Sequence, residues 1–248
     1  MTYCVGLKLH DGIVMLSDSR TNAGVDSIGT FAKLFTWEQP GDRVLAVMTA
    51  GNLSVSQEVM SLLNNDFTDV VSGYSLMTAP TMFDAAAVIG AAIRFIDYRD
   101  GTAIRGQGAD PSITLLFGGQ IKGRPPNLYM LYYAGNFIEA TEDTPFLQLG
   151  ETKYGKPILD RVIRPETSLT QAAKCALVSM DSTLRSNISV GLPLDLLVIE
   201  RDALRIAVRQ RIDENDSYFN DIRQRWSDGL RTALAAIPEP HWSPASGK

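Results

Sequence analysis

The sequence predicts an α+β domain built as a four-layer αββα sandwich, in which two stacked antiparallel sheets are flanked by helices. Segments with strand and helix character come in blocks: strands, two helices, strands, two helices, strands and a last helix. The chain opens on a strand that a tight turn joins to the next strand, which is typical of antiparallel pairing. Strands do not alternate singly with helices, so a doubly wound parallel sheet fits less well.

The first strands form a hairpin. Residues 5–9 alternate apolar with small or polar side chains, the pattern of a half-buried strand. Asp11 and Gly12 supply the turn, because glycine accepts the positive φ of a primed turn. The apolar run 13–16 predicts a strand buried on both faces, and the small, polar residues 17–24 predict a loop.

The other strands are apolar or mixed runs bounded by turn residues. They are expected at residues 32–37, 43–49, 112–118, 128–133, 146–149, 194–200 and 203–208. The last two are joined by a turn at Arg201 and Asp202, and residues 101–111 are expected to form a loop.

Helix starts are marked by capping residues. Asn52 and Ser54 are both candidate caps for the first helix. Three residue pairs match N-terminal capping patterns: Ser54 with Gln57, Thr81 with Asp84, and Ser168 with Gln171. The later helices are expected at residues 80–98, 152–163, 169–184 and 216–236.

No linker divides the chain, so residues 1–248 are expected to form a single domain. The core would take about residues 1–210, the C-terminal helix residues 211–237, and a loose, proline-containing tail residues 238–248. The last helix carries one apolar stripe that could pack on the core or on a neighbouring subunit. The stripe consists of Phe219, Ile222, Trp226, Leu230 and Leu234.

Composition excludes several classes of protein. A net charge of −5 does not support nucleic-acid binding. The longest apolar run, residues 85–93, is too short to span a membrane, and no signal peptide is evident, so a cytoplasmic protein is expected. Cys4 and Cys175 lack metal-ligand spacing and are interpreted as buried thiols, with a single disulfide left open. No cofactor or metal is expected.

The threonine at position 2 is the first candidate for chemistry. Once Met1 is removed, Thr2 carries a hydroxyl and a free α-amine, which together can act as nucleophile and base. A serine–histidine triad is disfavoured, because the two histidines, His10 and His241, lie near no Gly-x-Ser-x-Gly motif. Position alone is weak evidence, since Thr2 could simply begin a strand.

Three further residues fit the same chemistry. Lys33 would favour the neutral amine and the developing alkoxide, and Asp18 would hold Lys33 in place. Gly51 ends a strand just before a helix, where backbone N–H groups are free to bind an oxyanion. The alternatives are a structural ion pair and an ordinary turn glycine.

These residues together resemble the proteasome β-subunits. The resemblance is carried by Gly12-Ile-Val-Met-Leu-Ser-Asp18-Ser-Arg20-Thr21, then Lys33-Leu-Phe, then Thr49-Ala-Gly51, and covers about the first 210 residues. It is closest to the bacterial ancestral β-subunit group, Anbu. The opening Met1-Thr2-Tyr3, the Asp-Ser-Arg-Thr run and the long extra C-terminal helix agree with that group.

The resemblance implies an N-terminal-nucleophile hydrolase acting on peptide or protein substrates. It implies Thr2 as nucleophile with its amine as proton acceptor, Asp18 and Lys33 as the supporting charge pair, and the Gly51 amide as oxyanion donor. It also implies homo-oligomers, as a ring or an open spiral.

The chain departs from the family pattern at several points. Lys33 lies one residue closer to the threonine than in typical β-subunits. Gly150-Glu151-Thr152 stands where the family often has Gly-Ser-Gly. Ser186-Asn187-Ile188-Ser189-Val190-Gly191 stands where an Asp-x-x-Ser-Gly motif helps to hold the N-terminus, so Ser189 and Ser186 are the candidates to replace it.

Three functional hypotheses follow. The first is a threonine peptidase acting through Thr2. The second is a self-assembling compartment or scaffold with little hydrolysis, which the altered Ser186–Gly191 segment favours. The third is an amidase for small non-peptide amides. The first and third both require Met1 to be absent, because an amine in a peptide bond is no base.

Overall fold

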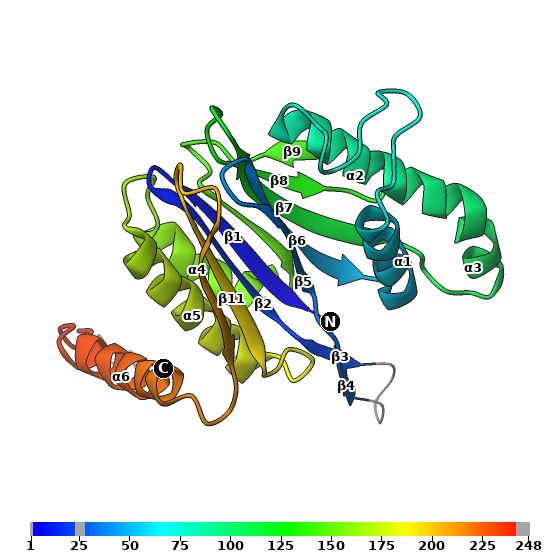
Figure 1. Cartoon of the computed structure of the whole chain (residues 1–248). Helices are drawn as coiled ribbons and strands as arrows, with labels where there is room; N and C mark the ends of the chain where they lie inside the picture. Colours follow the sequence, from blue (N-terminus) through cyan, green and yellow to red (C-terminus); the bar gives the residue numbers. More distant parts are fainter. Residues whose placement is uncertain (1, 23–27, 242–248) are drawn as a thin grey trace.

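Two five-stranded antiparallel sheets are stacked face to face, with helices on both outer faces (Figure 1). The computed structural model describes residues 2–22 and 28–241. Within these residues the expected α+β four-layer sandwich is confirmed. The predicted loop at residues 17–24 is wrong for residues 17–18 and 20–22, which lie in strands, and residues 23 and 24 fall outside the described residues. The predicted tail at 238–248 falls partly outside them, and Met1 entirely.

The first sheet contains the N-terminal hairpin at its centre. Its strand order is β10-β1-β2-β11-β12. The strands are β1 (Tyr3–Leu9), β2 (Gly12–Asp18), β10 (Phe146–Gly150), β11 (Leu194–Glu200) and β12 (Ile206–Ile212). Every residue of β2 is buried, as the apolar run predicted. The predicted start of the last strand at residue 203 is wrong, because the connection from β11 is longer than a two-residue turn and runs to Arg205.

The second sheet has the order β5-β6-β7-β8-β9. Its strands are β5 (Leu34–Gln39), β6 (Arg43–Gly51), β7 (Ile113–Ile121), β8 (Asn127–Leu131) and β9 (Phe137–Glu139). A separate two-stranded ribbon is formed by β3 (Arg20–Asn22) and β4 (Ile28–Thr30). These two strands and β9 were not predicted, since three residues carry too little periodicity.

The second sheet is covered by α1 (Leu53–Asn64) and α2 (Met82–Ile96). Asn52, not Ser54, caps α1, because the Asn52 side chain accepts the Val55 N–H and the Ser54 hydroxyl donates to Asn52. Thr81 caps α2 by accepting the Asp84 N–H, as predicted.

The helical path continues past α2 where a loop was expected. A turn of π-helix at Asp97–Gly101 leads into α3 (Thr102–Gly106). Arg105 donates to Asp97 across these turns at 2.9 Å. The expectation of a loop from Gly101 was therefore wrong in its first half.

The first sheet is covered by α4 (Thr152–Val162) and α5 (Leu169–Ser186). Ser168 caps α5 by accepting the Gln171 N–H, as predicted. Beyond α5 lies α6 (Ser217–Ala235), which contacts the domain mainly through α5 (Figure 1).

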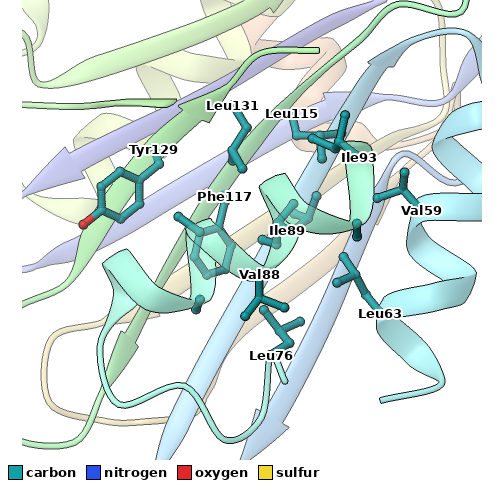
Figure 2. Packing of buried hydrophobic residues seen from close by; sticks show 14 of the residues in the cluster. Val59, Leu63, Leu76, Val88, Ile89, Ile93, Leu115, Phe117, Tyr129 and Leu131 are labelled. Carbon is teal, nitrogen blue, oxygen red and sulfur yellow. The ribbon is translucent and has the colours of Figure 1, made fainter. Parts of the chain in front are cut away.

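Three buried apolar clusters separate the four layers. One lies between the second sheet and α1 and α2; Figure 2 shows Phe117 and Leu131 of the sheet meeting Ile89 and Ile93 of α2. A second lies between the first sheet and α4, α5 and α6. The third lies between the two sheets. At about 25 cal/mol per Å² of apolar area, this burial dominates the stability of the fold.

Three of the five residues of the apolar stripe on α6, Phe219, Ile222 and Trp226, pack on the domain. Phe219 and Ile222 are buried, whereas Leu230 and Leu234 are 52% and 71% exposed. Arg223 of α6 donates at 2.7 Å to Asp181 of α5, a fully buried carboxylate. Among the described residues, no helix has the length and apolar character needed to cross a lipid bilayer.

Candidate active site

A cavity of about 360 Å³ opens where the ends of the two sheets meet. It is lined by Thr2, Thr21, Lys33, Thr49, Ala50, Gly51, Leu53, Ser56, Gly150 and Glu151. The lining comes from both sheets and from the start of α1. Three residues singled out in the sequence, Thr2, Lys33 and Gly51, therefore share one cavity.

Thr2 is held from the side of β10. Its carbonyl oxygen accepts the Glu151 N–H at 2.8 Å, directly before β1 begins. Gly150 has a φ of +75°, and a Cβ there would lie 1.8 Å from the Thr2 oxygen. Only glycine permits this approach. The backbone of Thr2 is thus fixed on one side by a contact that no larger residue at position 150 allows.

Asp18 and Lys33 form a buried ion pair. Lys33 Nζ lies 2.7 Å from Asp18 Oδ1, and the side chains are 6% and 0% exposed. Lys33 also donates to the Arg20 carbonyl oxygen at 2.6 Å. Asp18 ends the central strand β2, while Lys33 directly precedes β5, so the pair bridges the two sheets.

Asp18 also orients the backbone on both sides. It accepts the Tyr3 N–H at 3.1 Å and the Gly191 N–H at 3.3 Å. Burial raises the pKa of the Asp18 carboxyl above its ordinary value, and Lys33 and the two N–H donors oppose that shift. The carboxylate fixes the residue that follows Thr2 and the ammonium group that lines the cavity.

The Gly51 N–H points toward the Lys33 side of β6. Asn52 donates its N–H to the carbonyl oxygen of Ser112, directly before β7, so the alternation of an antiparallel ladder turns the preceding N–H away from β7. Thr49, two residues earlier and on the same side, donates to the Lys33 carbonyl oxygen. Gly51 has a φ of +110° and leaves no room for a Cβ against Ser112. Gly51 and Lys33, which lie toward the same edge of β6, thus both line the cavity.

Tyr3 connects the start of β1 to the helix layer. Its hydroxyl lies 2.6 Å from Ser179 Oγ of α5 and accepts the Gln148 side-chain N–H at 2.6 Å. Burial raises the pKa of Tyr3 to about 12. Sequence reasoning did not single out this network, because a tyrosine in a buried strand carries no distinguishing pattern.

Ser186 ends α5, and Ser189 lies in the segment that follows it. Among the residues that the structure describes, neither Ser186 nor Ser189 lines the cavity. Ser186 is exposed, and the Ser189 N–H donates to Asn187. The backbone of the same segment contacts the buried ion pair, because the Gly191 N–H donates to Asp18.

The cysteines belong to no disulfide. Cys4 and Cys175 are both buried free thiols, so the disulfide left open by the sequence is not formed. Burial raises the pKa of each thiol, to about 11 for Cys175. Within the described residues, no group of three or more histidine, cysteine or acidic side chains is placed to hold a metal ion.

Chemically, the cavity combines a hydroxyl, a buried cation and a directed backbone N–H group. These are the elements of nucleophilic attack on a carbonyl with stabilisation of the resulting oxyanion. Thr21, Thr49 and Glu151 also line the cavity. Thr21 and Thr49 lie in the segments that carry the resemblance, and Glu151 lies at a departure from the family pattern.

Comparison with solved structures finds close similarity along nearly the whole chain. Anbu (ancestral beta-subunit) from Yersinia bercovieri is 48% identical, with a TM-score of 0.90, over 97% of this chain and 100% of that one. The helical assembly of the Anbu complex from Pseudomonas aeruginosa is 52% identical, with a TM-score of 0.90, over 96% and 98%. Anbu from Hyphomicrobium sp. strain MC1 is 48% identical, with a TM-score of 0.87, over 97% and 100%.

A more distant similarity is found among curated proteins. Proteasome subunit beta 2 of Sulfurisphaera tokodaii is 24% identical over 191 residues, which make up 77% of this chain and 82% of that protein. A comparison with models of known protein families finds no match.

Proposed function

Because the chain belongs to the Anbu family of ancestral, proteasome-type β-subunits, we propose that it is a threonine N-terminal hydrolase that cleaves peptide or other amide bonds through Thr2. The nucleophile becomes active when Met1 is removed. We also propose a cytoplasmic location, which the two free, buried thiols favour.

The buried Asp18–Lys33 pair is the observation that carries this function. Two desolvated charges contribute little net stability compared with apolar side chains of the same size. Here they lie at the cavity that contains Thr2, and Asp18 also holds the Tyr3 N–H. Their position is explained if Lys33 lowers the proton affinity of the amine and stabilises developing negative charge.

The proposed reaction begins with attack of Thr2 Oγ on the substrate carbonyl carbon. The hydroxyl proton moves to the α-amine, and the electron pair of the carbonyl bond moves onto its oxygen, which accepts the Gly51 N–H. When the carbon–nitrogen bond breaks, the ammonium group protonates the leaving amine. Water then attacks the ester, gives a proton to the amine, and releases the acid while Thr2 regains its proton.

Other residues hold the reacting groups in position. Asp18 orients Lys33 and the start of β1. The segment Ser186–Gly191, including Ser189, is assigned a positioning role through the Gly191 N–H, which contacts Asp18.

The decisive experiment compares wild type with Thr2→Ala and Thr2→Ser after the mass of the mature N-terminus has been measured. We expect wild type to lack Met1, to cleave members of a peptide library and to react with a threonine-directed electrophile. Thr2→Ala should lose both activities and Thr2→Ser should keep part of each. Full turnover by Thr2→Ala, or a retained Met1 in an active sample, would refute the assignment.

A second candidate is a homo-oligomeric scaffold with little hydrolysis. The exposed Leu230 and Leu234 on α6 favour association, and a similar Anbu chain is known as a helical assembly. Whether the chain is a hydrolase or a scaffold, we propose that it forms homo-oligomers, as a ring or an open spiral. Light scattering at micromolar concentration should give a mass of several protomers, and a monomer would contradict it.

The library screen separates the hydrolytic hypotheses. An amidase for small substrates would cleave N-acyl compounds but no peptides, and a scaffold would cleave neither.

A further inference from the structure

Glu151 is one of the residues that line the cavity containing Thr2. Its backbone N–H donates to the Thr2 carbonyl oxygen at 2.8 Å, so the two residues are direct neighbours across the end of β10. The side chain is only 14% exposed.

One oxygen of the Glu151 carboxylate, Oε2, is buried. Glu151 Oε2 has no hydrogen-bond partner among the described residues. Glu151 takes the N-cap position of α4, yet its side chain makes no capping hydrogen bond. Lys153 Nζ lies 3.5 Å from Oε2, but its side chain is 69% exposed. Because a buried carboxylate oxygen without a donor is costly, its position calls for a further partner.

We propose that Glu151 is the carboxylate partner of the Thr2 α-amino group, which stabilises the ammonium formed when the amine takes the proton of the Thr2 hydroxyl. This role rests on the proposed function, since the amine exists only after Met1 is removed. Glu151 is then a positioning and charge-stabilising residue: it accepts a hydrogen bond from the ammonium and forms no covalent bond.

The other charged side chains of the site already have hydrogen-bond partners. Asp18 is bound to Lys33 and to two backbone N–H groups. Lys33 donates to Asp18 and to the Arg20 carbonyl oxygen. The Cys4 thiol, beside that pair, is kept neutral because burial raises its pKa. Glu151 is thus the cavity carboxylate that has no hydrogen-bonded cation among the described residues.

The two charged side chains oppose each other in their effect on the amine. Lys33 lowers the pKa of the amine, and a carboxylate within hydrogen-bond distance raises it. Glu151 therefore makes the amine a stronger base and moves the pH at which it becomes neutral upward. A purely structural role at the start of α4 has no such effect.

The test measures the pKa of the Thr2 amine directly, without relying on turnover. Wild type and Glu151→Gln react with a limiting amount of acetic anhydride across a pH series, and mass spectrometry of the N-terminal peptide gives the extent of acylation. We expect Glu151→Gln to lower the amine pKa by about one unit, so that acylation below that pKa becomes about tenfold faster. The acid limb of kcat/KM should shift in the same direction.

Matched variants separate this effect from a change in fold or in overall charge. Glu151→Asp keeps the charge and should retain most of the wild-type pKa. Glu142→Gln removes the same charge from an 85% exposed site near His10 and should shift nothing. Lys153→Met removes a positive charge near Glu151 and should raise the amine pKa slightly.

Failure of the role proposed for Glu151 can be distinguished from failure of the proposed hydrolase. An amine that is present and has the same pKa in wild type, Glu151→Gln and Glu151→Asp would overturn the role of Glu151 and leave the hydrolase standing. A retained Met1 would overturn both.

Discussion

Lys33→Met isolates the energetics of the buried ion pair. Lys33 Nζ and Asp18 Oδ1 are 2.7 Å apart. With an effective dielectric constant of about 20, Coulomb's law gives an attraction of about 6 kcal/mol. Taking each ion out of water costs several kcal/mol, so the pair contributes little net free energy. Removal of one partner leaves the other charge buried and uncompensated.

We expect Lys33→Met to lower the free energy of unfolding by about 3–5 kcal/mol at about pH 8. Asp18→Asn combined with Lys33→Met should cost about 2–3 kcal/mol less than the sum of the single changes. Urea unfolding followed by tryptophan fluorescence measures both quantities. The protein concentration is kept fixed, because association of subunits adds to apparent stability.

The loss of stability caused by Lys33→Met should depend on pH, and the pKa shift of Asp18 gives the direction of that dependence. Burial raises the pKa of Asp18 above its value of about 3.9 in the unfolded chain. Between those two pKa values the folded state binds the proton more tightly, so stability falls as pH rises through the window. Lys33→Met removes an interaction that lowers the Asp18 pKa, so its cost should shrink as the pH is lowered toward 5.

Lys156→Met is the matched control. Lys156 Nζ also lies 2.7 Å from a carboxylate, that of Asp160, but the side chains are 54% and 49% exposed. Its loss should cost no more than about 1 kcal/mol. Additive costs for Lys33 and Asp18, or a Lys33→Met cost no larger than this control, would refute the reasoning.

Three further outcomes concern other parts of the molecule. Gly51→Ala should lower stability by more than about 1 kcal/mol and abolish hydrolysis, since φ is +110° and a Cβ would meet a carbonyl oxygen at 2.3 Å; an unchanged Tm would contradict this. Burial raises the pKa of Cys175 to about 11, so its alkylation by iodoacetamide near pH 8 should be roughly 100-fold slower than that of free cysteine, measured by mass spectrometry; an equal rate would argue against burial. Asp181→Asn should speed tryptic cleavage within α6, because Asp181 binds Arg223 there. Asp228→Asn, which removes an exposed pair, should not.

Much of the fold was predictable because its signals are local. The turn at Gly12, the buried strand that follows and the caps at Thr81 and Ser168 all depend on neighbours in the sequence. The first helix shows the limit of this approach. Ser54 matches a capping box, but its hydroxyl binds Asn52, which takes the cap because the chain leaves β6 at that point.

The candidate site was predictable only in part. Thr2, Lys33 and Gly51 line one cavity, and Asp18 binds Lys33, yet spacing alone left a structural ion pair and a turn glycine as alternatives. Family resemblance, not periodicity, joined them into one hypothesis. The exposure of Ser186 depends on how the chain leaves α5 and packs, which no local pattern encodes.

The apolar layer between the sheets also determines the alignment of the candidate catalytic groups. Thr2 precedes β1 and Asp18 ends β2 of the first sheet, while Lys33 precedes β5 and Gly51 ends β6 of the second. Their distances therefore depend on how closely the sheets approach, and a Cβ at Gly6 would lie only 2.9 Å from Leu128 of the opposite sheet. A substitution deep in this layer can thus misalign the nucleophile and the cation in a protein that still folds. Loss of activity without loss of stability would then report the spacing of the sheets, with every residue of the cavity unchanged.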